Sequence, residues 1–91
     1  MATSVPMEDM VTAPEDATGF DWRGGVVALR MSDSTVRGRQ AVVDAACVDA
    51  VLEGPKGSSI LHMSGGGTIK SSAAFAELYP HFVTFWKANR R

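Results

Sequence analysis

The chain has 91 residues, of which 45% are hydrophobic and 21% are charged, and its formal net charge is −1. This composition is ordinary for one small globular domain and excludes a wholly disordered chain. The single cysteine excludes an intramolecular disulfide, and no apolar run approaches the roughly 18 residues that a membrane-spanning helix requires.

The charges are distributed unevenly along the chain. Residues 1–22 carry five acidic side chains and no Lys or Arg, which gives −5, while the other five acids and all nine basic residues give +4. Residues 1–19 also show no sustained periodicity, so we expect them to form a flexible acidic tail, either solvated or folded over a basic face. Residues 20–91 are expected to form a single domain. The first residues lack the basic and apolar regions of a secretory signal, which favours a cytoplasmic location.

Two large aromatic residues open the predicted domain in "FDW", residues 20–22. Such a pair typically pins a segment onto a domain, and the alternative is an exposed hook for a partner. The β-branched run "VVALRM" at 26–31 then predicts a strand. "SDST" at 32–35 is typical of a turn, and "VRGRQAVVD" at 36–44 predicts a second strand with Gly38 at a bulge.

The central part of the chain predicts further strands. "ACVDAVLE" at 46–53 favours a strand over a helix, because the run is short and is followed by the turn sequence "GPKG". "SSILHMS", "GGG" and "TIK" predict a β-hairpin whose loop is residues 65–67. In its first arm Ile60 and His62 face one side and Leu61 and Met63 the other, so both faces are partly apolar.

The C-terminal segment "SSAAFAELYPHFVTFWKANRR" predicts a helix, with Ser71 or Ser72 as its N-cap. Pro80 cannot donate a hydrogen bond to the carbonyl of Ala76, so we expect a kink or a break into two pieces. The predicted fold class is α+β: a small, three- or four-stranded, mostly antiparallel sheet covered by this Pro-kinked aromatic helix. A stripe at helical spacing is expected to supply the core and consists of Phe75, Leu78, Tyr79, Phe82 and Trp86.

The glycine-rich stretch "LHMSGGGTIKSS" at 61–72 predicts a turn and no chemistry. Lys70 does not directly follow the last glycine, as the phosphate-binding P-loop requires. Ser64 lacks the Gly-x-Ser-x-Gly pattern, and only His62 and His81 could serve as its base. Cys47 lies among apolar neighbours and is expected to be a small buried hydrophobe. One cysteine and two scattered histidines offer no metal-ligand spacing. We therefore expect no enzymatic activity, no cofactor and no metal.

From residue 41 to residue 83 the order of motifs resembles the first half of a LytTR-type DNA-binding domain. The matching motifs are "AVLE", "GPKG", "SILHM", "GGG", "TIK", "FAEL" and "FV". The same order is similar to short bacterial flagellar-operon proteins of the FlbD kind. The resemblance implies DNA binding near the end of the chain. In that segment this chain has "TFWKANRR" where the family has a basic His-Arg-Ser-Tyr-like sequence, so only Lys87, Arg90 and Arg91 lie near the expected contacts.

Two binding functions follow from these patterns. The leading prediction is a non-enzymatic regulatory or adaptor module that binds another protein, or itself as a homodimer, because Trp, Phe and Met are enriched at interface cores. The candidate contacts for that function are Phe20, Trp22, Met63 and Trp86. The alternative is a small DNA-binding regulator with a steep salt dependence. Its candidate contacts are Arg30, Arg37, Arg39, Lys87, Arg90 and Arg91.

Overall fold

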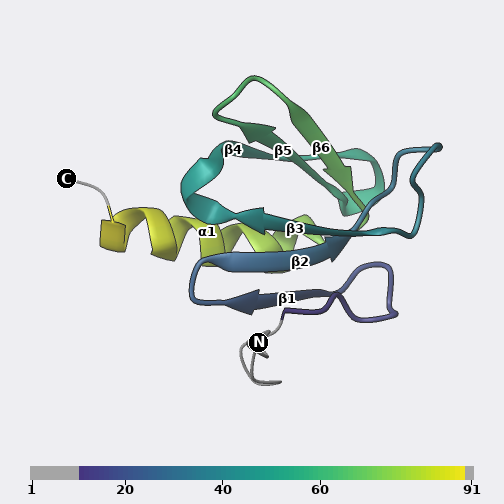
Figure 1. Ribbon diagram of the computed structural model, residues 1–91, viewed down its shortest axis with the longest axis horizontal. Helices are drawn as coiled ribbons and strands as arrows, with labels where there is room; N and C mark the ends of the chain where they lie inside the picture. Colours follow the sequence, from purple (N-terminus) through teal and green to yellow (C-terminus); the bar gives the residue numbers. More distant parts are fainter. Residues whose placement is uncertain (1–10, 90–91) are drawn as a thin grey trace, which may run out of the picture.

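The computed structural model describes residues 11–89 and contains two antiparallel three-stranded sheets and one C-terminal helix (Figure 1). The predicted α+β class, the antiparallel strands and the C-terminal helix are confirmed, and the strands are divided between two sheets instead of forming one. The first sheet has the order β1-β2-β3 and the second the order β4-β5-β6. The strands are β1 (Phe20–Arg23), β2 (Val26–Arg30), β3 (Gln40–Asp44), β4 (Val48–Glu53), β5 (Ser59–Met63) and β6 (Thr68–Ser71), and the helix is α1 (Phe75–Asn89).

Strand β1 shows that "FDW" is part of the first sheet. A two-residue turn at Gly24 and Gly25, with φ of +59° and +94°, reverses the chain between β1 and β2. Two positive φ angles in succession suit the right-handed twist of a hairpin, which explains why glycine occupies both positions. Trp22 is thereby paired with Val27, on the face of the sheet that points to the core.

The connection between β2 and β3 is longer than the sequence predicted. Residues 36–39 precede the strand, and Gly38 has a φ of +81° within a turn, so it is not at a bulge. The Gly38 amide donates to the carbonyl of Met31, which closes this turn at 2.9 Å. After β3, a short 3-10 turn (Ala45–Cys47) leads into β4. Cys47 is exposed on that turn, so the expectation of a buried cysteine is wrong.

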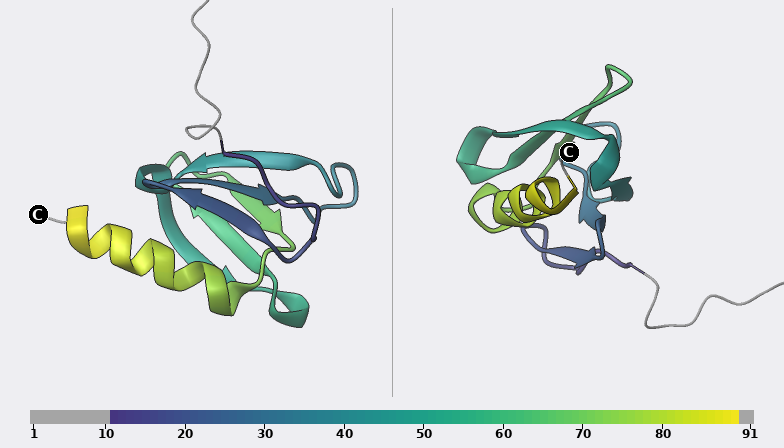
Figure 2. Two further views of the ribbon diagram at one scale, coloured as in Figure 1. Left: turned by 90° about the horizontal axis from the view of Figure 1, so that it is seen from below. Right: turned by 90° about the vertical axis from the view of Figure 1, so that its left-hand side faces the viewer.

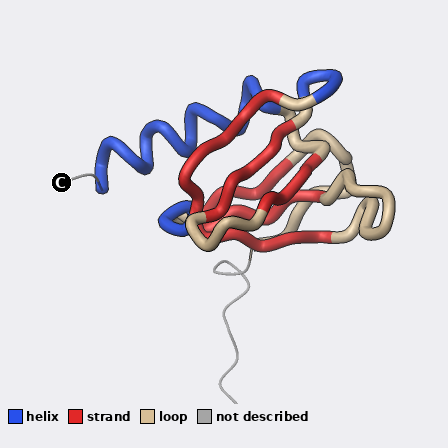
Figure 3. Tube along the Cα trace, turned by 90° about the horizontal axis from the view of Figure 1, so that it is seen from above, coloured by secondary structure: helices blue, strands red, loops and turns tan. Residues whose placement is uncertain are grey.

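The two sheets are joined where β2 ends, at a junction that we call the seam. Met31 and Ser71 form an isolated antiparallel bridge. The amide of Ser32 donates to the carbonyl of Lys70 at 3.0 Å, and the amide of Ser72 donates to the carbonyl of Arg30 at 3.1 Å. Figure 3 shows the strands of both sheets in their layers with the helix along one side.

Helix α1 lies between the two sheets, as the view along its axis in Figure 2 shows. It runs through Pro80 as one element, so a break into two pieces does not occur. Pro80 and Ala76 are both exposed, and water can therefore satisfy the carbonyl that Pro80 leaves without a donor. The helix begins at Phe75, and neither predicted serine is its N-cap. Their hydroxyls instead donate to the carbonyls of Arg30 and Ala17.

The core combines side chains from both sheets and the helix. Leu78 and Phe82 are the buried residues of α1, and the ring of Phe82 contacts Trp22 edge-on at a centroid distance of 5.0 Å. The completely buried members from the strands include Val27 and Leu29 of the first sheet and Leu61 of the second. Burial of this kind stabilises by roughly 1.5–3 kcal/mol for each large side chain. No helix within residues 11–89 is both long and apolar enough to cross a bilayer.

Residues 12–18 form an N-terminal strap across the outer face of the first sheet. The amide of Thr12 donates to the carboxylate of Asp21, and the amide of Ala13 donates to the Gln40 side chain at 2.6 Å. Ala13 is only 2% exposed. The sequence placed these residues in the flexible tail, whereas the structure places them on the domain. The first ten residues of that predicted tail lie outside the described part of the chain.

Candidate functional site

The aromatic residues predicted to contact a partner are packed within the domain. Trp22 stacks on His81 at a centroid distance of 5.3 Å, and Phe20 meets the same imidazole edge-on. The indole nitrogen of Trp86 donates to the carbonyl of Ala45 at 3.4 Å. All of these aromatic side chains, and Met63 as well, are half-buried against the core. The hook interpretation of "FDW" is therefore not supported by its placement.

The basic residues predicted to contact DNA are not gathered on one surface. Arg30 is committed to the fold, because its guanidinium donates to the carbonyls of Ala13, Pro14 and Gly38. Arg37 and Arg39 lie on the turn between β2 and β3, and Lys87 lies at the opposite end of the molecule (Figure 1). Arg90 and Arg91 are outside the described residues. The described part of this set therefore separates into two distant groups.

The glycine loop is a hairpin turn, as its sequence predicted. Gly66 has a φ of +97°, and its amide donates to the carbonyl of Met63 at 2.9 Å. The Ser64 hydroxyl hydrogen-bonds to a carboxylate oxygen of Asp49 at 3.0 Å and to the carbonyl of Cys47. His62 is exposed on the outer face of β5. Among the described residues, no three His, Cys, Asp or Glu side chains form a group that could hold a metal ion.

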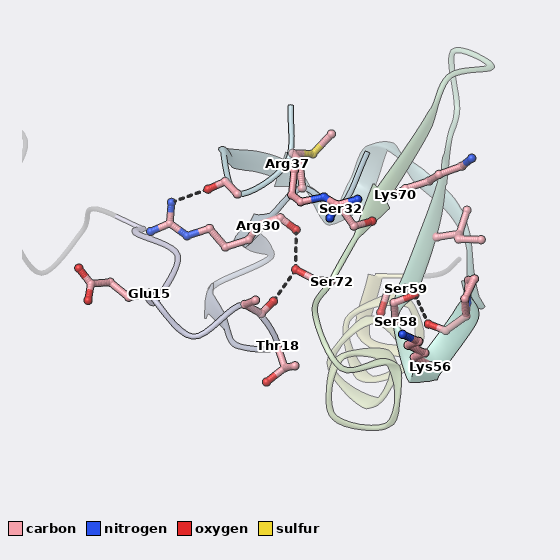
Figure 4. Close-up of a pocket in the computed structure, with 15 residues that line it drawn as sticks. Glu15, Thr18, Arg30, Ser32, Arg37, Lys56, Ser58, Ser59, Lys70 and Ser72 are labelled. Atoms are coloured by element: carbon pink, nitrogen blue, oxygen red, sulfur yellow. Dashed lines mark hydrogen bonds between the residues drawn. The ribbon is translucent and has the colours of Figure 1, made fainter. Parts of the chain in front are cut away.

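A different site is formed at the seam by a groove of about 870 Å³. This seam groove lies where the end of β2 meets β6, between the strap on one side and the turn that joins β4 to β5 on the other (Figure 4). Its volume is within the range of about 300–1,000 Å³ that is usual for ligand pockets. The lining residues are Glu15, Ala17, Thr18, Arg30, Met31, Ser32, Arg37, Gly38, Pro55, Lys56, Ser58, Ser59, Ile60, Lys70 and Ser72.

Three exposed cations line the seam groove and come from three separate parts of the chain. Arg37 comes from the turn between β2 and β3, and Lys70 from the outer face of β6. Lys56 lies on a 3-10 turn (Pro55–Gly57) and has a φ of +57°, which is uncommon for a residue other than glycine. None of these three side chains has a hydrogen bond or an ion pair to another described residue. Their charges are therefore available to a ligand.

The hydroxyl groups of the seam groove are mostly committed to the backbone. Ser59 donates to the carbonyl of Ala73 at 2.9 Å, and Ser58 donates to the carbonyl of Pro55 at 2.7 Å. Ser72 donates to the carbonyl of Ala17 at 2.6 Å and so fastens the strap to the floor of the groove. The hydroxyl protons of Ser58, Ser59 and Ser72 are therefore already used within the fold.

The strap brings negative charge to the other side of the seam groove. Figure 4 shows Glu15 on the side of Ser72 away from Lys56 and Lys70. Asp16 follows, and hydrogen bonds from the amide and hydroxyl of Thr18 lower the pKa of its carboxyl below the ordinary 3.8. A hydrogen bond to the charged form favours that form. Asp16 is therefore ionised at neutral pH.

A second, smaller hollow lies on the far side of the strap and shares Thr18 with the seam groove. Its volume is about 370 Å³. Two carboxylates line it, those of Asp16 and Glu77, together with the imidazole of His81. The strap thus separates a cationic groove from an acidic hollow.

Comparison with known proteins gave no relative from which a function could be transferred. No family model matches the chain, no curated protein matches it, and no solved structure matches it. The resemblance to LytTR-type domains and to FlbD-like proteins therefore stays a prediction.

Proposed function

We propose that the protein is a non-enzymatic regulatory or adaptor module that holds a negatively charged segment of a partner protein in the seam groove. The observation that supports this proposal is that Arg37, Lys56 and Lys70 all line one groove. Each side chain is exposed and forms no hydrogen bond or ion pair with residues 11–89. Cations whose charged groups form no hydrogen bond or ion pair with the described residues are suited to an external carboxylate, and complementary charge also speeds the encounter between partners.

Several observations favour a protein partner over DNA. Proteins that bind duplex DNA commonly neutralise about 6–10 phosphates, which requires a continuous basic surface. Here Arg30 is engaged by backbone carbonyls, and Lys87 lies at the far end of the molecule. The lining of the seam groove also includes no aromatic side chain on which an unpaired base could stack. Three cations around one groove match a few carboxylates better than a long polyanion.

The test is a binding assay with a short synthetic peptide of alternating Glu and Ser that carries a fluorescein label. Binding is followed by fluorescence anisotropy at about 50 mM and about 200 mM salt, since an electrostatic contact weakens as salt rises. The groove variant combines Arg37→Gln, Lys56→Asn and Lys70→Gln. Asparagine is chosen at position 56 because it tolerates a positive φ. The control combines Arg39→Gln and Lys87→Gln, which removes two exposed charges outside the groove.

We expect the groove variant to bind about tenfold more weakly than the wild-type chain, because exposed ion pairs contribute about 0.2–1 kcal/mol each. The control variant should bind like the wild type. Equal affinities for the groove and control variants would overturn the proposal. If the wild-type chain binds a duplex DNA more tightly than the peptide, and the groove variant does not bind that DNA, the partner is DNA and not a protein.

A further inference from the structure

The seam groove has apolar as well as cationic walls. Four of its lining residues have apolar side chains, namely Ala17, Met31, Pro55 and Ile60. We infer that the segment bound there carries an aliphatic side chain beside its carboxylates, and that Ile60 belongs to the subsite that receives this side chain. This inference rests on the proposed function, because it specifies the ligand of the same groove. It identifies the ligand class as an acidic peptide with an aliphatic anchor.

The position of Ile60 follows from the register of the second sheet. Ile60 pairs with Lys70 on one side and with Leu52 on the other, so all three share the outer face. Gly54 allows Ile60 to lie against the turn between β4 and β5, because a Cβ at position 54 would come within 3.3 Å of Ile60 Cγ1. The half-buried side chain of Ile60 consequently lies beside Lys70 on the neighbouring strand. It also lies beside the turn that carries Lys56.

The charges on the strap argue against a uniformly negative polymer as the ligand. A polyanion that leaves the groove across the strap meets Glu15 first and then Asp16 and Glu77 at the acidic hollow. Asp16 is negatively charged at neutral pH, as an Asp carboxyl with its ordinary pKa would also be, and its hydrogen bonds with Thr18 lower that pKa further. Like charges that meet in this way oppose binding. A peptide can place its carboxylates at the cations and present neutral or basic residues to the strap, whereas an oligonucleotide cannot.

The experiment compares two labelled peptides that contain the same number of Glu residues and differ at one central position, Leu in one and Ser in the other. A labelled oligothymidylate is the third probe. Affinities are measured by anisotropy for the wild-type chain, for Ile60→Thr and for Leu52→Thr. The last variant is a matched control, because Leu52 is 44% exposed on the same face of the same sheet and does not line the groove. Thermal unfolding checks that both variants are folded.

We expect the wild type to bind the Leu peptide about tenfold more tightly than the Ser peptide, the scale set by a small apolar difference in a pocket. Ile60→Thr should abolish this preference, and Leu52→Thr should retain it. Equal binding of the two peptides by the wild type would overturn the inference and leave the proposed function standing. A stronger affinity for oligothymidylate than for either peptide would also overturn it. Failure of both peptides to bind would refute the proposed function itself.

Discussion

Arg30 joins three chain segments, and its replacement tests how the strap is held beside the groove. The guanidinium donates to the carbonyl of Pro14 at 3.1 Å and to the carbonyl of Ala13 at 3.0 Å, both in the strap. It also donates to the carbonyl of Gly38 at 3.1 Å, in the turn that carries Arg37. The substitution Arg30→Met keeps most of the aliphatic stem and removes all three donors. The strap and the turn should then lose their common anchor.

The expected loss follows from the number and exposure of these hydrogen bonds. A typical hydrogen bond contributes about 0.5–1.5 kcal/mol net, and a charged donor contributes more. The bonds to Pro14 and Gly38 are exposed, and the bond to Ala13 is partly buried, so water replaces the donor at two of the three carbonyls. We therefore expect Arg30→Met to lower the free energy of unfolding by about 2 kcal/mol.

Two measurements report on this change. Urea denaturation gives the free energy of unfolding, and a glutamate-specific protease reports local opening of the strap through cleavage after Glu15. The matched control is Arg39→Met, because Arg39 is exposed on the same turn and its side chain has no hydrogen-bond partner within the described residues. A difference of less than about 0.5 kcal/mol between the two variants, together with equal rates of cleavage, would show that Arg30 does not anchor the strap.

Three further predictions concern the core, one turn and one carboxylate. Phe82→Ala should lower the free energy of unfolding by about 3–5 kcal/mol in urea denaturation, because the ring is completely buried. Gly25→Ala should destabilise the fold by more than about 1 kcal/mol in the same assay, because φ is +94° and the new Cβ would lie 2.5 Å from Phe85 Cε2. Gly65→Ala is the control and should be neutral, because its new Cβ meets no atom within 4 Å. The Asp16 carboxyl should titrate below pH 3.8 when it is followed by NMR, and a midpoint at or above 3.8 would contradict its hydrogen bonds. Its contribution to stability is complete above the pKa of the unfolded chain and is lost as the pH falls through the lower pKa of the folded chain.

Local patterns predicted the hairpin around the triple glycine because its signals lie within a few residues of one another. The turn glycines and the alternating side chains of β5 are sufficient to specify that pairing. The same kind of signal was present at Gly24 and Gly25, where two successive positive φ angles form the turn between β1 and β2. The preceding aromatic residues were interpreted as an arm because "FDW" is too short to show alternation.

The strap and the seam groove depend on contacts between distant residues, which local patterns do not contain. Arg30 contacts a carbonyl 17 residues away, and Ser72 contacts one 55 residues away. The sequence placed Lys56 on a turn and Arg37 in the predicted second strand, whereas the structure places Arg37 on the turn before β3. Both residues line one groove because the up-and-down strand order puts the two turns at the same end of the molecule. The packing of Phe20 and Trp22 likewise depends on a distant segment, because His81 of α1 contacts both rings.

The location of the groove follows from how the two sheets meet. Their junction consists of one bridge between Met31 and Ser71, so few backbone groups are paired across it. The interior beside the junction holds the small polar side chains of Ser59 and Ser71, both completely buried, whose hydroxyls donate to the carbonyls of Ala73 and Arg30. These hydroxyls satisfy the local backbone but supply little apolar surface to close the end of the domain. The strap and two turns cover that end incompletely, and Arg37, Lys56 and Lys70 line the groove that remains. A partner segment that is both acidic and aliphatic would complete the cover that residues 11–89 leave open.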